Sequence, residues 1–210
     1  MTMTLSFRLA GPDDSAHGAA LIMLTLREFG DHFFGFGSHE RALQVVAQLF
    51  GQARNRFSHQ HAILAHQDGD VLGLLVQFTA RSMRRTWLAT ALQLMHIYRS
   101  AEMLSFIKLL LHYRSEERIA KDELYIAHLA VYPQAQRSGF GQKLLAHAAQ
   151  QARAQGLPKL SLLTELENQP AINLYHKAGF QISETIHYPA EMHYLGSIGS
   201  LRMVKHITTH

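Results

Sequence analysis

The spacing of apolar and polar side chains divides this chain into short strands and amphipathic helices. Apolar runs and alternating patterns that are typical of strands occupy residues 5–9, 61–65, 71–78, 124–131, 159–164, 181–188 and 201–207. Apolar residues three and four positions apart predict helices after Asp14, over 39–57 and after Gly141. Because strands and helices follow one another along the chain, the sequence indicates an α/β protein.

Glycine and turn residues mark the connections between these elements. Residues 30–37 are rich in glycine and phenylalanine, and we expect a loop there. Asp68-Gly69-Asp70 separates two strand-like runs and predicts a hairpin turn. No linker, repeat or low-complexity stretch interrupts the chain, so we expect one domain over residues 1–210.

Residues 82–120 contain neither Gly nor Pro, which favours helix throughout. We expect two helices that separate near Arg99–Ala101. Their apolar faces, which include Trp87 and Leu88, need a partner. The preferred interpretation is packing within this domain. The alternative is a second subunit, which would make the protein a homodimer.

Composition limits the classes of protein. Of the 210 residues, 47% are hydrophobic, no Cys is present, and the formal charge is +4. These values exclude a disordered chain, disulfides and a cysteine acyl-enzyme. No membrane span or signal peptide is recognisable, so we expect a soluble cytoplasmic protein without a membrane partner. Arg81, Arg84 and Arg85 form too short a basic cluster to predict nucleic-acid binding.

Two groups of histidines could suggest metal ligands. His59, His61 and His66 lie close in sequence, as do His187 and His193. No carboxylate accompanies either group at the spacing that a metal site needs. We therefore expect scattered surface histidines and no metal.

The segment after the strand at 124–131 has the features of an anion site. A Pro turn is followed by Gly139 and Gly141, and then by a helix whose first N–H groups and dipole favour negative charge. An ordinary helix N-terminus is the alternative interpretation. A dinucleotide fingerprint would need Gly at the position of Leu144, and Gly141-Gln142-Lys143 does not complete a P-loop. A pyrophosphate is the ligand that this segment would suit.

Two motifs in this region resemble signatures of the GNAT N-acetyltransferase superfamily. The first is Val131-Tyr132-Pro133 with Gln136-Arg137-Ser138-Gly139-Phe140-Gly141, which resembles the family's acyl-CoA loop. The second comprises Asn168, Ala171, Leu174-Tyr175 and Gly179-Phe180. The resemblance implies a mixed, mostly antiparallel central sheet flanked by helices. Residues 124–180 would form the acyl-CoA core and residues 82–120 a helical insertion.

The same resemblance implies acetyl-CoA as the cosubstrate and a small-molecule or peptide amine as the acceptor. The pantetheine arm would lie beside Leu129, Ala130 and Val131, and an N–H near Leu129 or Ala130 would polarise the thioester carbonyl. Asn168 would contact pantetheine, cap a helix, or do both. The pyrophosphate would lie on the loop made by Gln136, Arg137, Ser138, Gly139, Phe140, Gly141 and Gln142.

The resemblance also suggests catalytic residues. Tyr175 would protonate the departing CoA thiolate, whereas the structural alternative is a core aromatic residue. Tyr125 takes the position where we expect the family's carboxylate base. We therefore rank Glu123 first as the general base and His128 second, with a water relay through Tyr125 also open. Strand alternation places His128 on the opposite face unless a bulge intervenes. The competing hypothesis is a regulatory module that binds acyl-CoA without catalysis.

Overall fold

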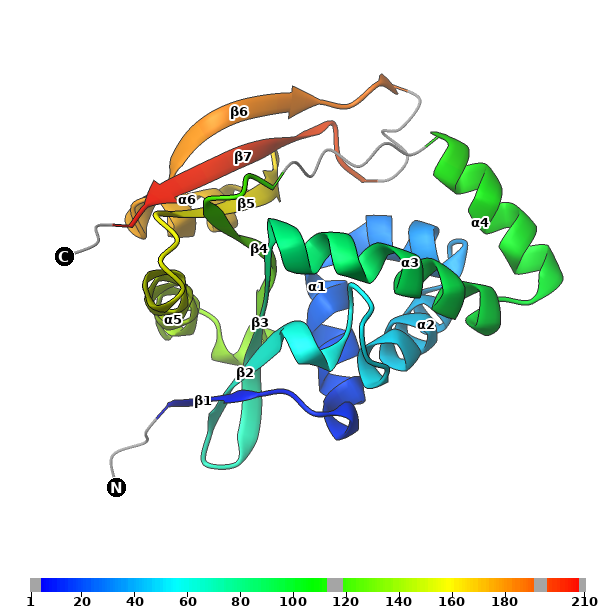
Figure 1. Ribbon diagram of the computed structural model, residues 1–210, viewed down its shortest axis with the longest axis horizontal. Coiled ribbons are helices and arrows are strands. Elements are labelled where there is room, and N and C mark those ends of the chain that lie inside the picture. Colours follow the sequence, from blue (N-terminus) through cyan, green and yellow to red (C-terminus); the bar gives the residue numbers. More distant parts are fainter. Residues whose placement is uncertain (1–4, 113–118, 191–195, 208–210) are drawn as a thin grey trace.

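The computed structural model describes residues 5–112, 119–190 and 196–207 (Figure 1). In this part of the chain, seven strands form one sheet in the order β1-β2-β3-β4-β5-β7-β6. The strands are β1 (Ser6–Leu9), β2 (Ala62–Gln67), β3 (Asp70–Thr79), β4 (Glu123–Val131), β5 (Lys159–Glu165), β6 (Gln181–His187) and β7 (Gly199–His206). The helices are α1 (Ser15–Gly35), α2 (His39–Gly51), α3 (Ala80–Ile97), α4 (Ser100–His112), α5 (Phe140–Ala154) and α6 (Gln169–Lys177).

The sheet has a helical layer on each face (Figure 1). Buried side chains of α1 and α2 form one apolar core with β2 and β3. Buried side chains of α5 and α6 form a second core with β4, β5 and β7. Helices therefore cover both faces of the central strands, whereas β6 at the edge is largely exposed, and the expected α/β class is confirmed.

Only one pair of neighbouring strands in the described sheet is parallel, and this pair is short. β4 pairs with β5 from Glu123 to Ile126, opposite Lys159 to Leu162. Beyond Ile126, β4 continues to Val131 paired with β3, while β5 continues to Glu165 paired with β7. The two strands therefore diverge, and an opening forms between their carboxyl-terminal halves.

β4 contains a bulge at the point where this divergence begins. Ile126 pairs with Gln77 and His128 pairs with Val76, which leaves Ala127 as an extra residue on β4. A residue inserted in one strand of an antiparallel pair shifts the alternation of the side chains that follow it. The bulge that would change the orientation of His128 is thus present.

The two apolar cores show the effect of the bulge. On the α5 face, β4 contributes even-numbered residues before Ala127 and odd-numbered residues after it: Leu124, Ile126, Leu129 and Val131. His128 therefore points to the α1 face, the face to which Tyr125 is directed by alternation. A side-chain hydrogen bond between His128 and Thr25 of α1 agrees with this orientation.

The expectation of a loop over residues 30–37 is wrong, because α1 continues to Gly35. Gly30 and Gly35 serve close packing there and not a turn. A Cβ on Gly35 would lie 2.8 Å from the Ala42 backbone nitrogen, so α1 and α2 approach closely at this glycine. The turn itself is confined to Phe36 and Gly37, which have φ values of 54° and 94°.

The second helix is shorter than the interval 39–57 that its spacing suggested. α2 ends at Gly51, and the residues after it are held by a buried amide. Asn55 is fully buried, and its Nδ2 donates to the carbonyls of Leu49 and Gln52 and to Oε1 of Gln93. Side-chain hydrogen bonds thus replace the helical ladder beyond Gly51.

The region 82–120 contains the two expected helices, with their break after Ile97. Residues 113–118 lie outside the described residues, and Ile119 and Ala120 are not helical. The expectation that the apolar residues of the first helix pack inside is wrong for Trp87, Leu88, Leu92 and Met95, which are exposed, whereas Tyr98 after the helix is buried in the core. α3 instead buries Thr86 and Leu94. None of the helices in the described part of the chain is long and apolar enough to cross a membrane.

Candidate active site

The opening between β4 and β5 gives the predicted pantetheine strand a free edge. Leu129, Ala130 and Val131 pair on one side with β3, opposite Leu75, Leu74 and Gly73. On the other side, the pairing with β5 has ended at Ile126. Peptide groups along this edge can therefore bind an extended amide-containing ligand in the manner of an added strand.

The loop after β4 is held against the end of that strand. Nε2 of Gln136 donates to the Val131 carbonyl at 3.1 Å. Arg137 then adopts a left-handed conformation with φ of 63°, and Ser138 is exposed. These contacts turn the chain from the edge of β4 toward the start of α5.

The two loop glycines have different structural roles. Gly139 is the N-cap of α5 with φ of 79°, and a Cβ built there would meet no atom within 4 Å. Glycine is therefore needed at position 139 for its backbone conformation and not for lack of space. Gly141 lies against α6, because a Cβ there would lie 3.0 Å from Cδ2 of Leu174. This close approach places α6 beside the first turn of α5.

The first turn of α5 has the N–H groups that an anion site needs. Lys143 donates its backbone N–H to the Gly139 carbonyl at 3.1 Å, so the N–H groups of the residues before it precede the intrahelical ladder. Phe140 is buried, whereas Gln142 is exposed. The arrangement has the polarity and the open space that a pyrophosphate requires.

α6 carries the two residues that the second motif singled out. Oδ1 of Asn168 accepts the Ala171 N–H at 3.3 Å, so this residue caps the helix. The Tyr175 ring is buried and lies 5.9 Å from that of Phe180. Burial raises the pKa of Tyr175 to about 12. The phenol is therefore protonated at neutral pH, as a proton donor must be.

Glu123 is engaged in a buried ion pair at the start of β4. Its two carboxylate oxygens accept from Nη2 of Arg202 at 2.8 and 2.6 Å, and Oε1 also accepts the Ala120 N–H. Leu129 is six residues farther along the strand, which corresponds to roughly 20 Å at about 3.3 Å per residue. Glu123 thus lies far from the predicted thioester and is held by other contacts.

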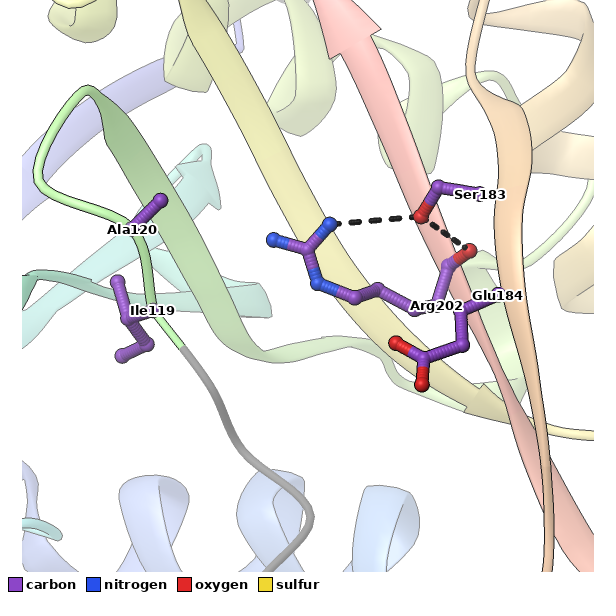
Figure 2. A pocket seen from close by; sticks show the side chains of 5 residues that line it. All are labelled: Ile119, Ala120, Ser183, Glu184 and Arg202. Carbon is purple, nitrogen blue, oxygen red and sulfur yellow. Dashed lines mark hydrogen bonds between the residues drawn. The ribbon is translucent and has the colours of Figure 1, made fainter.

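A surface depression lies beside this ion pair (Figure 2). It is lined by Ile119, Ala120, Ser183, Glu184 and Arg202. Ser183 links the two neighbouring strands, because its hydroxyl donates to the Arg202 carbonyl and accepts from Nη1 of the same residue. The depression is at the amino-terminal end of β4, away from the Gly139 loop.

His128 lies next to the predicted thioester position and is oriented by α1. The Thr25 hydroxyl donates to the Ile22 carbonyl at 2.7 Å. Its oxygen also lies 2.7 Å from Nδ1 of His128. A hydroxyl has one hydrogen, so Thr25 accepts from the Nδ1–H group. When the ring is neutral, its proton is then on Nδ1, and the nitrogen that can accept a proton is Nε2, which is buried in this structure.

A group of charged residues that the sequence analysis missed lies where α1 reaches the end of β5. Nη1 of Arg27 is 3.1 Å from Oε2 of Glu165. Arg27 interrupts the helical backbone with φ of 51° and ψ of −136°. Burial raises the pKa of Glu165, and the nearby carboxylates of Glu167 and Glu28 raise it further. The signal in the sequence was Glu165-Leu166-Glu167 directly after a buried strand.

α1 therefore connects the two strands that diverge. Thr25 contacts His128 on β4, and Arg27, two residues later, contacts Glu165 at the end of β5. The structure thus brings a histidine and a carboxylate toward the same segment of α1. The predicted loop precedes α5, Tyr175 lies on α6, and this segment belongs to α1.

The match to a family of known enzymes agrees with this geometry. The acetyltransferase (GNAT) family model matches residues 26–180. Because this match covers more than half of the chain, the protein belongs to the GNAT acetyltransferase family. Enzymes of this family use acetyl-CoA and acetylate amine acceptors. The search of curated proteins found no match.

Solved structures support the fold. An acetyltransferase shares 21% identity over 97% of this chain and 100% of its own, with a TM-score of 0.68. An N-acetyltransferase from Staphylococcus aureus Mu50 shares 19% identity over 95% and 99%, with a TM-score of 0.74. N-acetylglutamate synthase from Neisseria gonorrhoeae, complexed with coenzyme A and N-acetyl-glutamate, shares 22% identity over 98% of this chain and 35% of its own, with a TM-score of 0.53. The mixed, mostly antiparallel sheet with its diverging β4–β5 pair is thus the GNAT fold.

Proposed function

We propose that this protein transfers an acetyl group from acetyl-CoA directly to a primary amine. The observation that carries this proposal is the opening between β4 and β5, which has the Gly139 loop at one end. The free edge of β4 suits the pantetheine amides, and the first turn of α5 suits the pyrophosphate. With no Cys in the chain, a direct attack is the simplest acyl transfer.

In this proposal, His128 is the general base. The acceptor nitrogen attacks the thioester carbon, and Nε2 of His128 removes the proton that this nitrogen loses. A backbone N–H near Leu129 or Ala130 donates to the carbonyl oxygen as it becomes negative. His128 is preferred to Glu123 because of its position on β4 and the orientation that Thr25 gives it. Tyr125, on the same face, would hold a water or the acceptor.

Tyr175 is proposed as the general acid. When the carbon–sulfur bond breaks, the phenol donates its proton to the CoA thiolate. The position of α6 supports this role, because Leu174 packs against Gly141 at the first turn of α5. The neighbouring Tyr175 therefore lies on a helix that packs against the proposed cosubstrate loop.

The charges near α1 support a cationic acceptor. Glu28, Glu165 and Glu167 outnumber the one arginine, Arg27, that lies among them. An acceptor with a second positive charge, such as a diamine, would be attracted by these carboxylates.

The test measures the release of CoA thiol from acetyl-CoA across amino acids, peptides, monoamines and diamines. Mass spectrometry checks that the acceptor gains one acetyl group. Gly139→Glu is the control, because its bulk and negative charge should block the cosubstrate loop. Tight CoA binding without acetylation of any amine would instead identify a non-catalytic acyl-CoA-binding module.

A further inference from the structure

The outward face of α3 carries exposed apolar side chains at helical spacing. Trp87 is 76% exposed, Leu88 63%, Leu92 48% and Met95 60%. Thr86 and Leu94, the buried residues of this helix, lie on the side away from Leu88, Leu92 and Met95, and Trp87 lies at the border between the two sides. We call the four residues, together with the arginines described next, the α3 surface.

The charge on the α3 surface is of one sign. Arg81, Arg84 and Arg85 are exposed in the first turns of the helix. None of them forms an ion pair with any residue in the described part of the chain. Residues 80–99 contain no Asp or Glu. An apolar face thus continues directly into a cluster of unneutralised positive charges.

We propose that the α3 surface docks the protein onto an anionic lipid bilayer. A surface helix with Trp and Leu at its exposed centre and arginines beside them can place its apolar side chains at the headgroup boundary. The arginines then lie near lipid phosphates, where guanidinium groups bind well. Docking at the bilayer surface needs no membrane-spanning segment, so the absence of such a segment from the sequence does not oppose it.

Charge complementarity favours a bilayer over a second copy of this chain. If two α3 helices paired antiparallel, Arg84 and Arg85 of one copy would meet His96 and Arg99 of the other. If they paired parallel, the arginine clusters would meet each other. Neither arrangement supplies a carboxylate from α3. Like charges brought together without counter-charges are destabilising.

The single tryptophan of the chain provides a direct probe, since Trp87 belongs to the α3 surface. Its fluorescence is recorded while vesicles of phosphatidylcholine mixed with phosphatidylglycerol are added to the full-length protein. We expect a shift to shorter wavelength and co-sedimentation with these vesicles. Vesicles of phosphatidylcholine alone should bind much more weakly, and salt should weaken binding to the anionic vesicles.

Two variants separate the contributions of the arginine charges and of the apolar side chains to vesicle binding. Replacing all three arginines, as Arg81→Gln/Arg84→Gln/Arg85→Gln, should lower affinity for anionic vesicles roughly a hundredfold, at about fivefold per charge. Leu88→Ser/Leu92→Ser should also weaken binding while Trp87 remains as the probe. The matched control is Lys121→Gln/Arg153→Gln/Lys177→Gln, which loses the same charge outside the α3 surface. Circular dichroism checks that each variant is folded.

Three results would overturn the proposal. They are no binding of the folded protein to anionic vesicles, equal binding to both vesicle types, or an equal loss of affinity in the control variant. A wavelength shift that depends on protein concentration without vesicles would show instead that a second copy covers Trp87. That result would assign the α3 surface to self-association.

Discussion

Tyr175 occupies a buried position that suits both a packing and a chemical role. Its ring packs near Phe180, and burial raises its pKa to about 12. Phe differs from Tyr only in lacking the hydroxyl group, so Tyr175→Phe removes that group and retains the packing of the ring. A change in turnover would thus report the hydroxyl itself.

We predict that Tyr175→Phe lowers kcat about a hundredfold or more and leaves the CoA Kd nearly unchanged. Steady-state kinetics and calorimetric titration with CoA measure the two quantities. Because the pKa of Tyr175 is about 12, the phenol remains protonated up to about pH 11, and it should impose no alkaline limit on wild-type kcat below that pH. Unchanged turnover in Tyr175→Phe would remove this residue from the mechanism.

Substitutions of Glu123 and His128 should affect different quantities. The Glu123 variant should lose stability, and the His128 variant should lose turnover. Glu123→Gln leaves Arg202 without its buried counter-charge and should lower the free energy of unfolding by roughly 3 kcal/mol. His128→Gln should lower kcat about a hundredfold or more. Denaturant unfolding and kinetics on both variants test this assignment. If folded Glu123→Gln lost turnover and His128→Gln did not, the base would be Glu123.

At the scale of elements, the two loop glycines predict different consequences of the same substitution. Gly139→Ala places a side chain in open space but forces a left-handed residue, at a cost of about 1 kcal/mol. Gly141→Ala brings its Cβ against Leu174 and should displace α6 from the loop. We predict a weaker CoA affinity for Gly141→Ala, partly restored by adding Leu174→Ala, as measured by calorimetry. Restoration of Gly139→Ala by the same Leu174→Ala change would contradict this explanation.

The sequence predicted most elements because their apolar spacing is local. The predictions were wrong where contacts with segments far away in the sequence determine the local structure or the burial of a side chain. Gly30 and Gly35 suggested a loop, yet they allow α1 to pack tightly on its neighbours. The apolar residues around Trp87 suggested a core face, yet α3 turns them outward. Local spacing reports how apolar a face is, but not what lies against it.

The same limit applies to the site. The Gly139 loop and α6 were found because their residues are contiguous in sequence. The segment of α1 at Arg27 and the end of β5 at Glu165 are 138 residues apart and meet only in the fold. Strand alternation places Glu123 on the face of Tyr125 and so favours it as the base, whereas its ion pair with Arg202 on β7 cannot be identified from sequence spacing.

At the scale of the whole molecule, positive and negative charges gather in different places. The carboxylates of Glu28, Glu165 and Glu167 lie near one another where α1 meets the end of β5, whereas the arginines of the α3 surface lie on a separate helix. We predict that Glu165→Gln raises KM about fivefold for a diamine and leaves KM for a neutral-chain monoamine unchanged. Because burial raises the pKa of Glu165, the wild-type preference for the diamine should decline as the pH falls and this carboxyl takes up a proton. Equal changes for both amines would show that Glu165 only supports the fold.

One extra residue in β4 has a consequence for how the cosubstrate opening arises. The bulge at Ala127 follows directly on Ile126, the last residue that pairs with β5. Bulges bend a strand and increase its twist, so Ala127 itself directs β4 away from β5. Deleting Ala127 should restore regular pairing, leave His128 on the α1 face, and let the two strands continue side by side. We predict that CoA affinity falls more than tenfold in the folded deletion variant and is kept in Ala127→Gly, as measured by calorimetry. A single inserted residue would then account for the opening in which the cosubstrate is proposed to bind.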